Sequence, residues 1–135
     1  MGGAIKHVAA GSFPNCVLLE NGSLRCFGEL VADFQKDRWS VPRYVAADLG
    51  AIKQVACGMR YTCILLENGS LRCFGLNIHG QCSVPTELGA VKEVAAGWNH
   101  TCALLEDGSV RCFGLNKNGQ CSVPTDLSTV ADIPI

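Results

Sequence analysis

Short apolar runs separated by turn residues recur along the chain and predict short β-strands. Asp107 and Gly108 separate two such runs, and an Asp-Gly pair in that place strongly favours a β-hairpin. Pro124 closes another run, and because proline cannot donate a backbone hydrogen bond we expect an edge strand there. This part of the chain therefore predicts four antiparallel strands, at residues 91–95, 101–105, 109–113 and 120–123.

The same pattern occurs three times, and each copy begins Gly-Ala-Ile/Val-Lys-x-Val-Ala or a close variant of it. The second and third copies have equal length, whereas the first carries insertions at residues 29–39 and 43–49. A period of about 40 residues is typical of stacked supersecondary units such as propeller blades or solenoid turns. The chain therefore divides into three repeats and the start of a fourth, at residues 3–49, 50–88, 89–127 and 128–135.

Two turn geometries are compatible with the hairpin of the second repeat. A two-residue loop of Asn68 and Gly69 distributes the cysteines and leucines over both faces. A three-residue turn with Gly69 in a left-handed bulge pairs Cys63 with Cys73 and places Cys, Leu, Leu and Cys on one face. We favour the second register, because it separates an apolar face from a polar one.

The predicted fold class is all-β, a partial β-propeller of three four-stranded antiparallel blades plus the first strand of a fourth. Gly and Pro interrupt the chain too often for sustained helical periodicity. Propellers usually need about four to eight blades to close around an axis, so three blades leave an open arc. We expect either a fragment of a longer chain or an arc that associates with itself through open blade edges.

The third copy resembles a regulator-of-chromosome-condensation repeat. It reads Val-Ala-Ala-Gly-Trp-Asn-His-Thr-Cys-Ala-Leu-Leu, followed by Asp-Gly, Cys-Phe-Gly and Asn-Lys-Asn-Gly-Gln. The resemblance extends over residues 3–127 and is weakest in the first copy, which lacks the Asn-x-x-Gly-Gln element. It implies a β-propeller, which in this family typically has about seven blades. Gly-Gln-Cys-Ser replaces the family's usual Gly-Gln-Leu-Gly at residues 80–83 and 119–122, so the resemblance transfers function less directly than fold.

Charge and composition disfavour two classes of partner. Eleven Lys and Arg residues oppose twelve Asp and Glu, and a net charge of -1 gives no overall field for nucleic acid or an acidic membrane. No apolar run approaches the roughly 18 residues that a membrane-spanning helix needs. The first residues also lack the basic patch and apolar core of a signal peptide. We therefore expect a protein partner and an intracellular location, in the cytoplasm or the nucleus.

Nine cysteines are present, and six of them recur as three pairs at one spacing. They are compatible with buried thiols, with a disulfide across each hairpin, or with zinc ligands. We favour buried thiols, because the count is odd and no signal peptide precedes the first repeat. Zinc lacks the Cys-x-x-Cys spacing, so we expect no metal and no cofactor. The pairs are Cys16 with Cys26, Cys63 with Cys73, and Cys102 with Cys112.

Catalysis has one weak candidate, His100 beside Cys102. The positions equivalent to His100 hold Pro14 and Tyr61, so no base recurs from repeat to repeat. No third group that would orient the histidine is evident. We therefore expect no enzymatic activity and no catalytic residues.

Positions that vary between otherwise matching repeats are the better guide to binding, because loop residues are free to specialise on a fixed scaffold. One set lies between the first and second strands of each repeat, and another lies in the insertion of the first repeat. Trp, Tyr and Arg are the side chains that most often anchor interfaces. The candidate partner-binding residues are Phe13, Arg60, Tyr61, Trp98, Asn99, His100, Phe34, Arg38 and Trp39.

The leading functional hypothesis is a non-catalytic interaction scaffold that binds a protein through these rim loops. The family resemblance adds two alternatives, guanine-nucleotide exchange on a small GTPase and substrate recruitment for a ubiquitin ligase. An exported inhibitor of similar architecture is a further alternative, and it predicts disulfides. The identity of the partner is not encoded in any motif of this chain.

Overall fold

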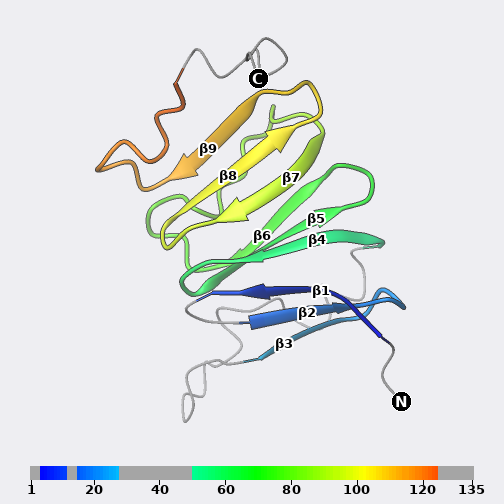
Figure 1. Cartoon of the computed structure of the whole chain (residues 1–135). Coiled ribbons are helices and arrows are strands. Elements are labelled where there is room, and N and C mark those ends of the chain that lie inside the picture. Colours follow the sequence, from blue (N-terminus) through cyan, green and yellow to red (C-terminus); the bar gives the residue numbers. More distant parts are fainter. Residues whose placement is uncertain (1–3, 12–14, 28–49, 125–135) are drawn as a thin grey trace, which may run out of the picture.

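The computed structural model describes residues 4–11, 15–27 and 50–124, which form three antiparallel sheets. The three sheets, which we call blades 1, 2 and 3, lie one above another in chain order (Figure 1). Both insertions and the start of the fourth repeat lie outside the described residues. No described helix is long and apolar enough to cross a membrane. The strands are β1 Ile5–Ala10, β2 Asn15–Leu19 and β3 Leu24–Phe27 in blade 1, β4 Ile52–Cys57, β5 Tyr61–Leu66 and β6 Leu71–Gly75 in blade 2, and β7 Val91–Ala96, β8 His100–Leu105 and β9 Val110–Gly114 in blade 3.

The hairpin register favoured from the sequence is confirmed. Cys63 pairs with Cys73 and Leu65 with Leu71 across β5 and β6, and blades 1 and 3 have the equivalent pairing. Gly69 has φ +91°, the left-handed conformation that the bulge requires and that glycine adopts without a Cβ penalty. The register puts Cys63, Leu65, Leu71 and Cys73 on one face of the blade 2 hairpin, and it puts Ile64 and Leu66 on the other face.

One short polar side chain fixes each hairpin turn. Its oxygen accepts a hydrogen bond from the backbone N–H two residues later, at 2.9 Å in all three blades. This Asx turn stabilises the loop locally, before any contact with another blade. The acceptor and donor residues are Asn21 and Ser23, Asn68 and Ser70, and Asp107 and Ser109.

The predicted fourth strand is wrong for blades 2 and 3, whose described sheets have three strands. In blade 2 the Cys82 N–H donates to Oδ1 of Asn77 at 2.7 Å, and the Ser83 N–H donates to the Gly80 carbonyl at 3.1 Å. These local bonds use the donors that a strand ladder would need. The segment still contributes to the core, because Cys82 and Val84 pack partly buried against it.

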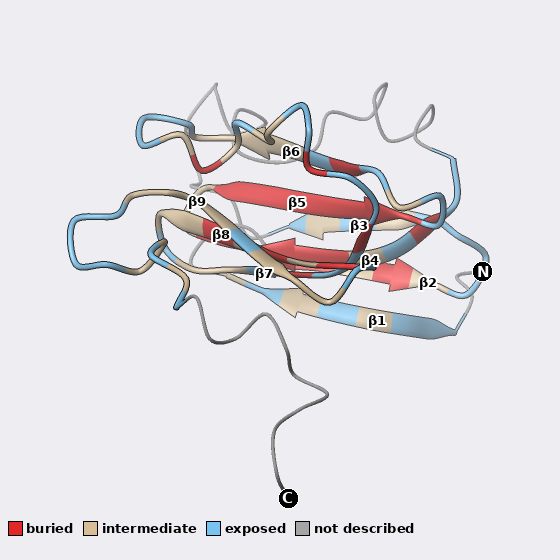
Figure 2. Ribbon diagram, turned by 90° about the horizontal axis from the view of Figure 1, so that it is seen from above, coloured by how far each residue is buried: buried red, intermediate tan, exposed pale blue. Residues whose placement is uncertain are grey.

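Apolar packing between neighbouring blades forms the core. We call the face of a blade that packs on the preceding blade its leading face, and the opposite one its trailing face. The trailing face of blade 2 is buried against the leading face of blade 3, and the blade 1 to blade 2 interface is built in the same way. As a result β5 is buried along its whole length, whereas β1 is largely exposed (Figure 2).

Polar bonds reinforce the same interfaces. The Gln54 side chain in β4 donates to the Val94 carbonyl and accepts from the Val94 N–H in β7, each at 3.0 Å. At the equivalent position of blade 1, His7 Nε2 is hydrogen-bonded to the Val55 carbonyl at 3.2 Å. These bonds connect the first strands of successive blades and fix how each blade is placed on the last.

We predict that Leu65→Ala lowers the free energy of unfolding by about 2–5 kcal/mol, because Leu65 is fully buried between blades 2 and 3. Ile78→Ala is the matched control, since Ile78 is 73% exposed and should change stability by less than about 0.5 kcal/mol. Urea unfolding followed by circular dichroism measures both values. Equal effects of the two substitutions would contradict this description of the core.

Candidate functional site

The loops between the first and second strands of the blades meet at one end of the sheets and form a rim. The described part of the rim comprises Gly11, 58–60 and 97–99. Two of these loops close through short backbone bonds, from the Gly58 N–H to the Tyr61 carbonyl at 2.9 Å and from the Gly97 N–H to the His100 carbonyl at 2.8 Å. A Met59 N–H to Trp98 carbonyl bond of 3.3 Å then connects the two loops.

Glycine is required at the start of each loop. A Cβ at Gly58 would overlap the Tyr61 ring and the Gly97 carbonyl oxygen, and one at Gly97 would overlap the His100 ring. The rings of these two residues therefore lie where a side chain would otherwise stand. The repeated glycine allows each loop to close over the ring that follows it.

Tyr61 was expected on the rim surface, and that placement is wrong. The side chain is fully buried between blades 2 and 3, where its hydroxyl lies 3.1 Å from the Gly97 carbonyl and 2.5 Å from the His100 carbonyl. The Thr101 hydroxyl lies 3.2 Å from the hydroxyl oxygen of Tyr61. Burial raises the pKa of the Tyr61 phenol above its ordinary value, so the residue is a neutral packing element.

Three further candidates, Arg60, Asn99 and His100, are half-buried, and their backbone carbonyls accept hydrogen bonds that hold the loops in place. Arg60 has a left-handed backbone, with φ +66°, and its carbonyl accepts the Leu76 N–H at 2.8 Å. Asn99, the equivalent residue of blade 3, accepts the Leu115 N–H at 2.8 Å in the same way. Arg60 and Asn99 thus connect the rim to the chain that follows the third strand in blades 2 and 3.

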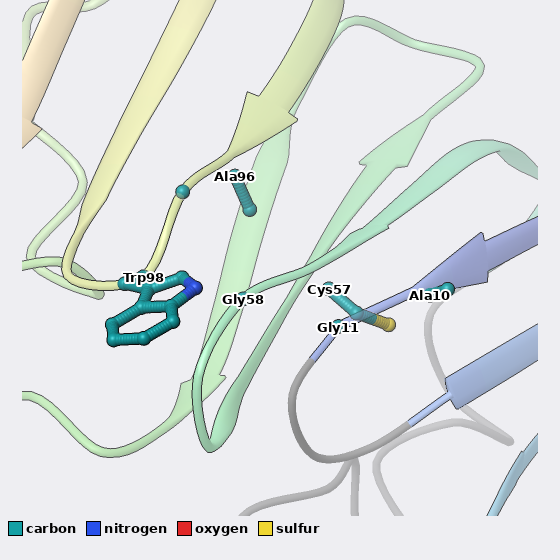
Figure 3. A pocket seen from close by; sticks show the side chains of 7 residues that line it. Ala10, Gly11, Cys57, Gly58, Ala96 and Trp98 are labelled. Atoms are coloured by element: carbon teal, nitrogen blue, oxygen red, sulfur yellow. The ribbon is translucent and has the colours of Figure 1, made fainter.

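Trp98 is the candidate that the structure leaves accessible, with 69% of the residue exposed. It borders a hollow of about 260 Å³ at the ends of the first strands (Figure 3). Apart from Trp98, backbone and small side chains line this hollow, so a partner can approach its walls closely. The lining residues are Ala10, Gly11, Cys57, Gly58, Ala96, Gly97 and Trp98.

The remaining candidates, Phe13, Phe34, Arg38 and Trp39, lie outside the described residues. The hollow itself was not anticipated from the sequence. Its signal was present in the small residue followed by glycine that ends the first strand of every repeat: Ala10-Gly11, Cys57-Gly58 and Ala96-Gly97.

Two of the three hairpin cysteine pairs are disulfides, which corrects the expectation of thiols throughout. Cys16 is bonded to Cys26 and Cys102 to Cys112, each with a Cα–Cα distance of 4.1 Å. The register permits these bonds, because it places the two cysteines of each hairpin directly opposite one another, as it also does for Cys63 and Cys73. The bond also means that Cys102 has no thiol to act as a nucleophile beside His100.

The other five cysteines are thiols. The sulfur atoms of Cys63 and Cys73 lie 2.8 Å apart in the equivalent hairpin of blade 2. Burial raises the pKa of the Cys57 thiol beside the hollow to about 12, so this group stays protonated near neutral pH. Among the described residues, no group of three His, Cys, Asp or Glu side chains is placed to hold a metal ion.

The family model for the regulator of chromosome condensation (RCC1) repeat matches the chain in three segments, residues 5–29, 52–81 and 91–120. Each segment begins in the first strand of a blade, so the sequence repeat and the structural repeat coincide. The segments also contain the loops that form the rim. No curated protein matches the chain significantly.

Several solved structures resemble this one. Prp20p from Saccharomyces cerevisiae is 23% identical with a TM-score of 0.67, over 90% of this chain and 33% of its own. Yeast RCC1 (Prp20) bound to Kap60 is 25% identical with a TM-score of 0.64, over 96% of this chain and 33% of its own. The ectodomain of the Physcomitrella patens receptor kinase CR4 is 22% identical with a TM-score of 0.65, over 84% and 30%. The chain thus spans about a third of each of these proteins.

We predict that Tyr61→Phe destabilises the fold by about 1–3 kcal/mol, because it removes the hydroxyl that donates to the Gly97 carbonyl inside the blade interface. Trp98→Phe is the matched control on the neighbouring loop and should leave stability nearly unchanged, since Trp98 is exposed. Thermal unfolding of both variants measures the difference. A larger loss from the Trp98 substitution would contradict the placement of these two rings.

We predict five free thiols in the denatured, unreduced protein, because the structure has two disulfides among nine cysteines. Alkylation followed by peptide mapping should identify them as Cys57, Cys63, Cys73, Cys82 and Cys121. In the native protein at pH 8, Cys57 should react much more slowly than it does after denaturation, because its raised pKa leaves little thiolate. Nine thiols in the denatured protein, or rapid native labelling of Cys57, would contradict the assignment.

Proposed function

Because the chain belongs to the regulator of chromosome condensation (RCC1) repeat family, we propose that it is a non-catalytic scaffold that binds a protein partner through its rim. The observation that carries this proposal is Trp98, an exposed aromatic residue beside a hollow on a loop held in place by backbone bonds. Large aromatic side chains with a polar atom are the residues that most often dominate the energetics of protein interfaces.

The described part of the rim is suited to binding because backbone hydrogen bonds hold the loops of blades 2 and 3 in place. The loop of Trp98 is closed by the Gly97 N–H and connected to the neighbouring loop through Met59. A partner that covers the indole therefore spends little free energy on ordering the backbone. Small side chains and glycine backbone line the hollow, and Cys57 beside it is a neutral thiol, so the hollow offers an uncharged surface that suits an uncharged side chain of a protein partner.

The structural relatives support a protein partner without identifying it. Prp20p was studied for its binding to Gsp1p and histones, and yeast RCC1 was solved bound to Kap60. Guanine-nucleotide exchange and substrate recruitment for a ubiquitin ligase remain alternatives for this chain. The exchange alternative depends on residues 29–39, which lie outside the described part of the chain.

One observation favours a second candidate, an exported binding protein or inhibitor. The two disulfides are more typical of an oxidising compartment than of the cytoplasm or nucleus. The intracellular location expected from the sequence therefore stays a prediction, and the thiol count proposed above bears directly on it. Both candidates bind a protein through the same rim.

We predict that Trp98→Ala abolishes the binding of proteins that the intact chain captures, while leaving its unfolding temperature unchanged. Glu67→Ala is the matched control, because this exposed residue lies at the hairpin end of the sheets, opposite the rim. Quantitative mass spectrometry of captured proteins identifies those lost with Trp98→Ala alone. Each is then tested as a purified protein by calorimetry.

Binding that survives Trp98→Ala in the purified pair would contradict the rim as the interface. A loss of at least about tenfold in affinity is expected for removal of a central indole, corresponding to about 1.4 kcal/mol. A turnover assay that detects chemistry on the partner would contradict the non-catalytic part of the proposal.

A further inference from the structure

The two blade interfaces follow one rule. In the first, Cys16 and Leu18 on the trailing face of blade 1 are buried by the leading face of blade 2. In the second, Cys63 and Leu65 on the trailing face of blade 2 are buried by the leading face of blade 3. Each blade therefore carries two complementary apolar faces, one for the blade before it and one for the blade after it.

Among the described residues, no blade packs on the leading face of blade 1, although this face has the composition of the others. Ile5 and Val8 are 60% and 65% exposed, whereas their equivalents Ile52 and Val55 in blade 2 are 5% and 2% exposed. The register is also the same, since Ile5 pairs with Leu19 as Ile52 pairs with Leu66. This is a formed docking face without its partner among the described residues.

The trailing face of blade 3 is the complementary surface. Cys102 and Leu104 are only half-buried, whereas their equivalents Cys63 and Leu65 in blade 2 are fully buried. Cys102 pairs with Cys112 and Leu104 with Val110, which repeats the arrangement of blade 2. Residues 4–11, 15–27 and 50–124 thus present a leading face at one end and a trailing face at the other that no described blade covers.

A polar side chain of blade 3, Glu93, also occupies a position that connects neighbouring blades. Glu93 in β7 occupies the position of Gln54, whose side chain binds the backbone of the following blade at Val94. Glu93 is exposed, and its carboxylate can accept the backbone N–H at the equivalent position of another first strand, although it has no N–H to repeat the donation of Gln54 to the carbonyl there. In blade 1 that position is Val8.

We propose that the leading face of blade 1 binds the trailing face of blade 3 in a second copy of this chain, head to tail. The partner is a second copy because one chain carries both faces, and the existing interfaces specify their contacts position by position. Three sheets in each of two copies make six, within the range of about four to eight blades that closes a propeller. The inference does not depend on the rim, because it uses faces that the rim does not contain.

The test is the solution mass of the purified chain by analytical ultracentrifugation over a range of concentrations. A dimer of twice 14.3 kDa is expected. Val8→Glu and Leu104→Glu should each weaken association by at least about tenfold, because each places a carboxylate in an apolar interface. Ile78→Glu is the matched control, since it adds the same charge at an exposed apolar residue outside both faces.

Mixing the two variants separates lost docking from lost folding. A mixture of Val8→Glu and Leu104→Glu chains retains one intact face of each kind, so it should recover a dimer that neither variant forms alone. A monomeric wild-type chain would overturn the proposal and leave the face to another blade or a different protein. A dimer that neither substitution weakens, or that the mixture fails to recover, would also overturn it.

Discussion

Apolar packing between the faces of neighbouring blades is the interaction on which the rest of this structure depends. Three short strands and a tight turn do not bury enough surface to be stable alone, so each blade needs a neighbour. In β5, Cys63 and Leu65 face the following blade and Ile64 and Leu66 face the preceding one, so the middle blade has an apolar surface on both sides. Gln54 then adds a pair of hydrogen bonds to β7 that fixes the position of one blade on the next.

The rim follows from the same packing. Tyr61 enters the interface between blades 2 and 3, where its hydroxyl reaches the carbonyls at the ends of the next loop. Gly58 and Gly97 leave space for the rings beside them, which keeps the loops close to the sheets. The Trp98 side chain remains exposed and can contact another molecule. The same blade stacking thus forms the core and positions the rim.

The strands and their register could be predicted from the sequence, because the position of each cysteine and leucine relative to the turn decides which face it joins. The absence of a fourth strand from blade 2 could not be predicted, since the side chain of Asn77 takes the Cys82 N–H, which an apolar pattern does not encode. Tyr61 was misplaced because its burial depends on a neighbouring blade. The bonded state of the cysteines also differs between hairpins of identical spacing, as Cys63 shows.

Amide hydrogen exchange, measured on the dissociated chain at low concentration, tests the central claim most directly. β1 and β4 are equivalent strands with the same pairing, but only β4 has a preceding blade to cover its leading face. If packing between blades supplies the stability, β4 and β5 should exchange much more slowly than β1. Equal protection of β1 and β4 would show that each sheet is stable by itself and would contradict this account.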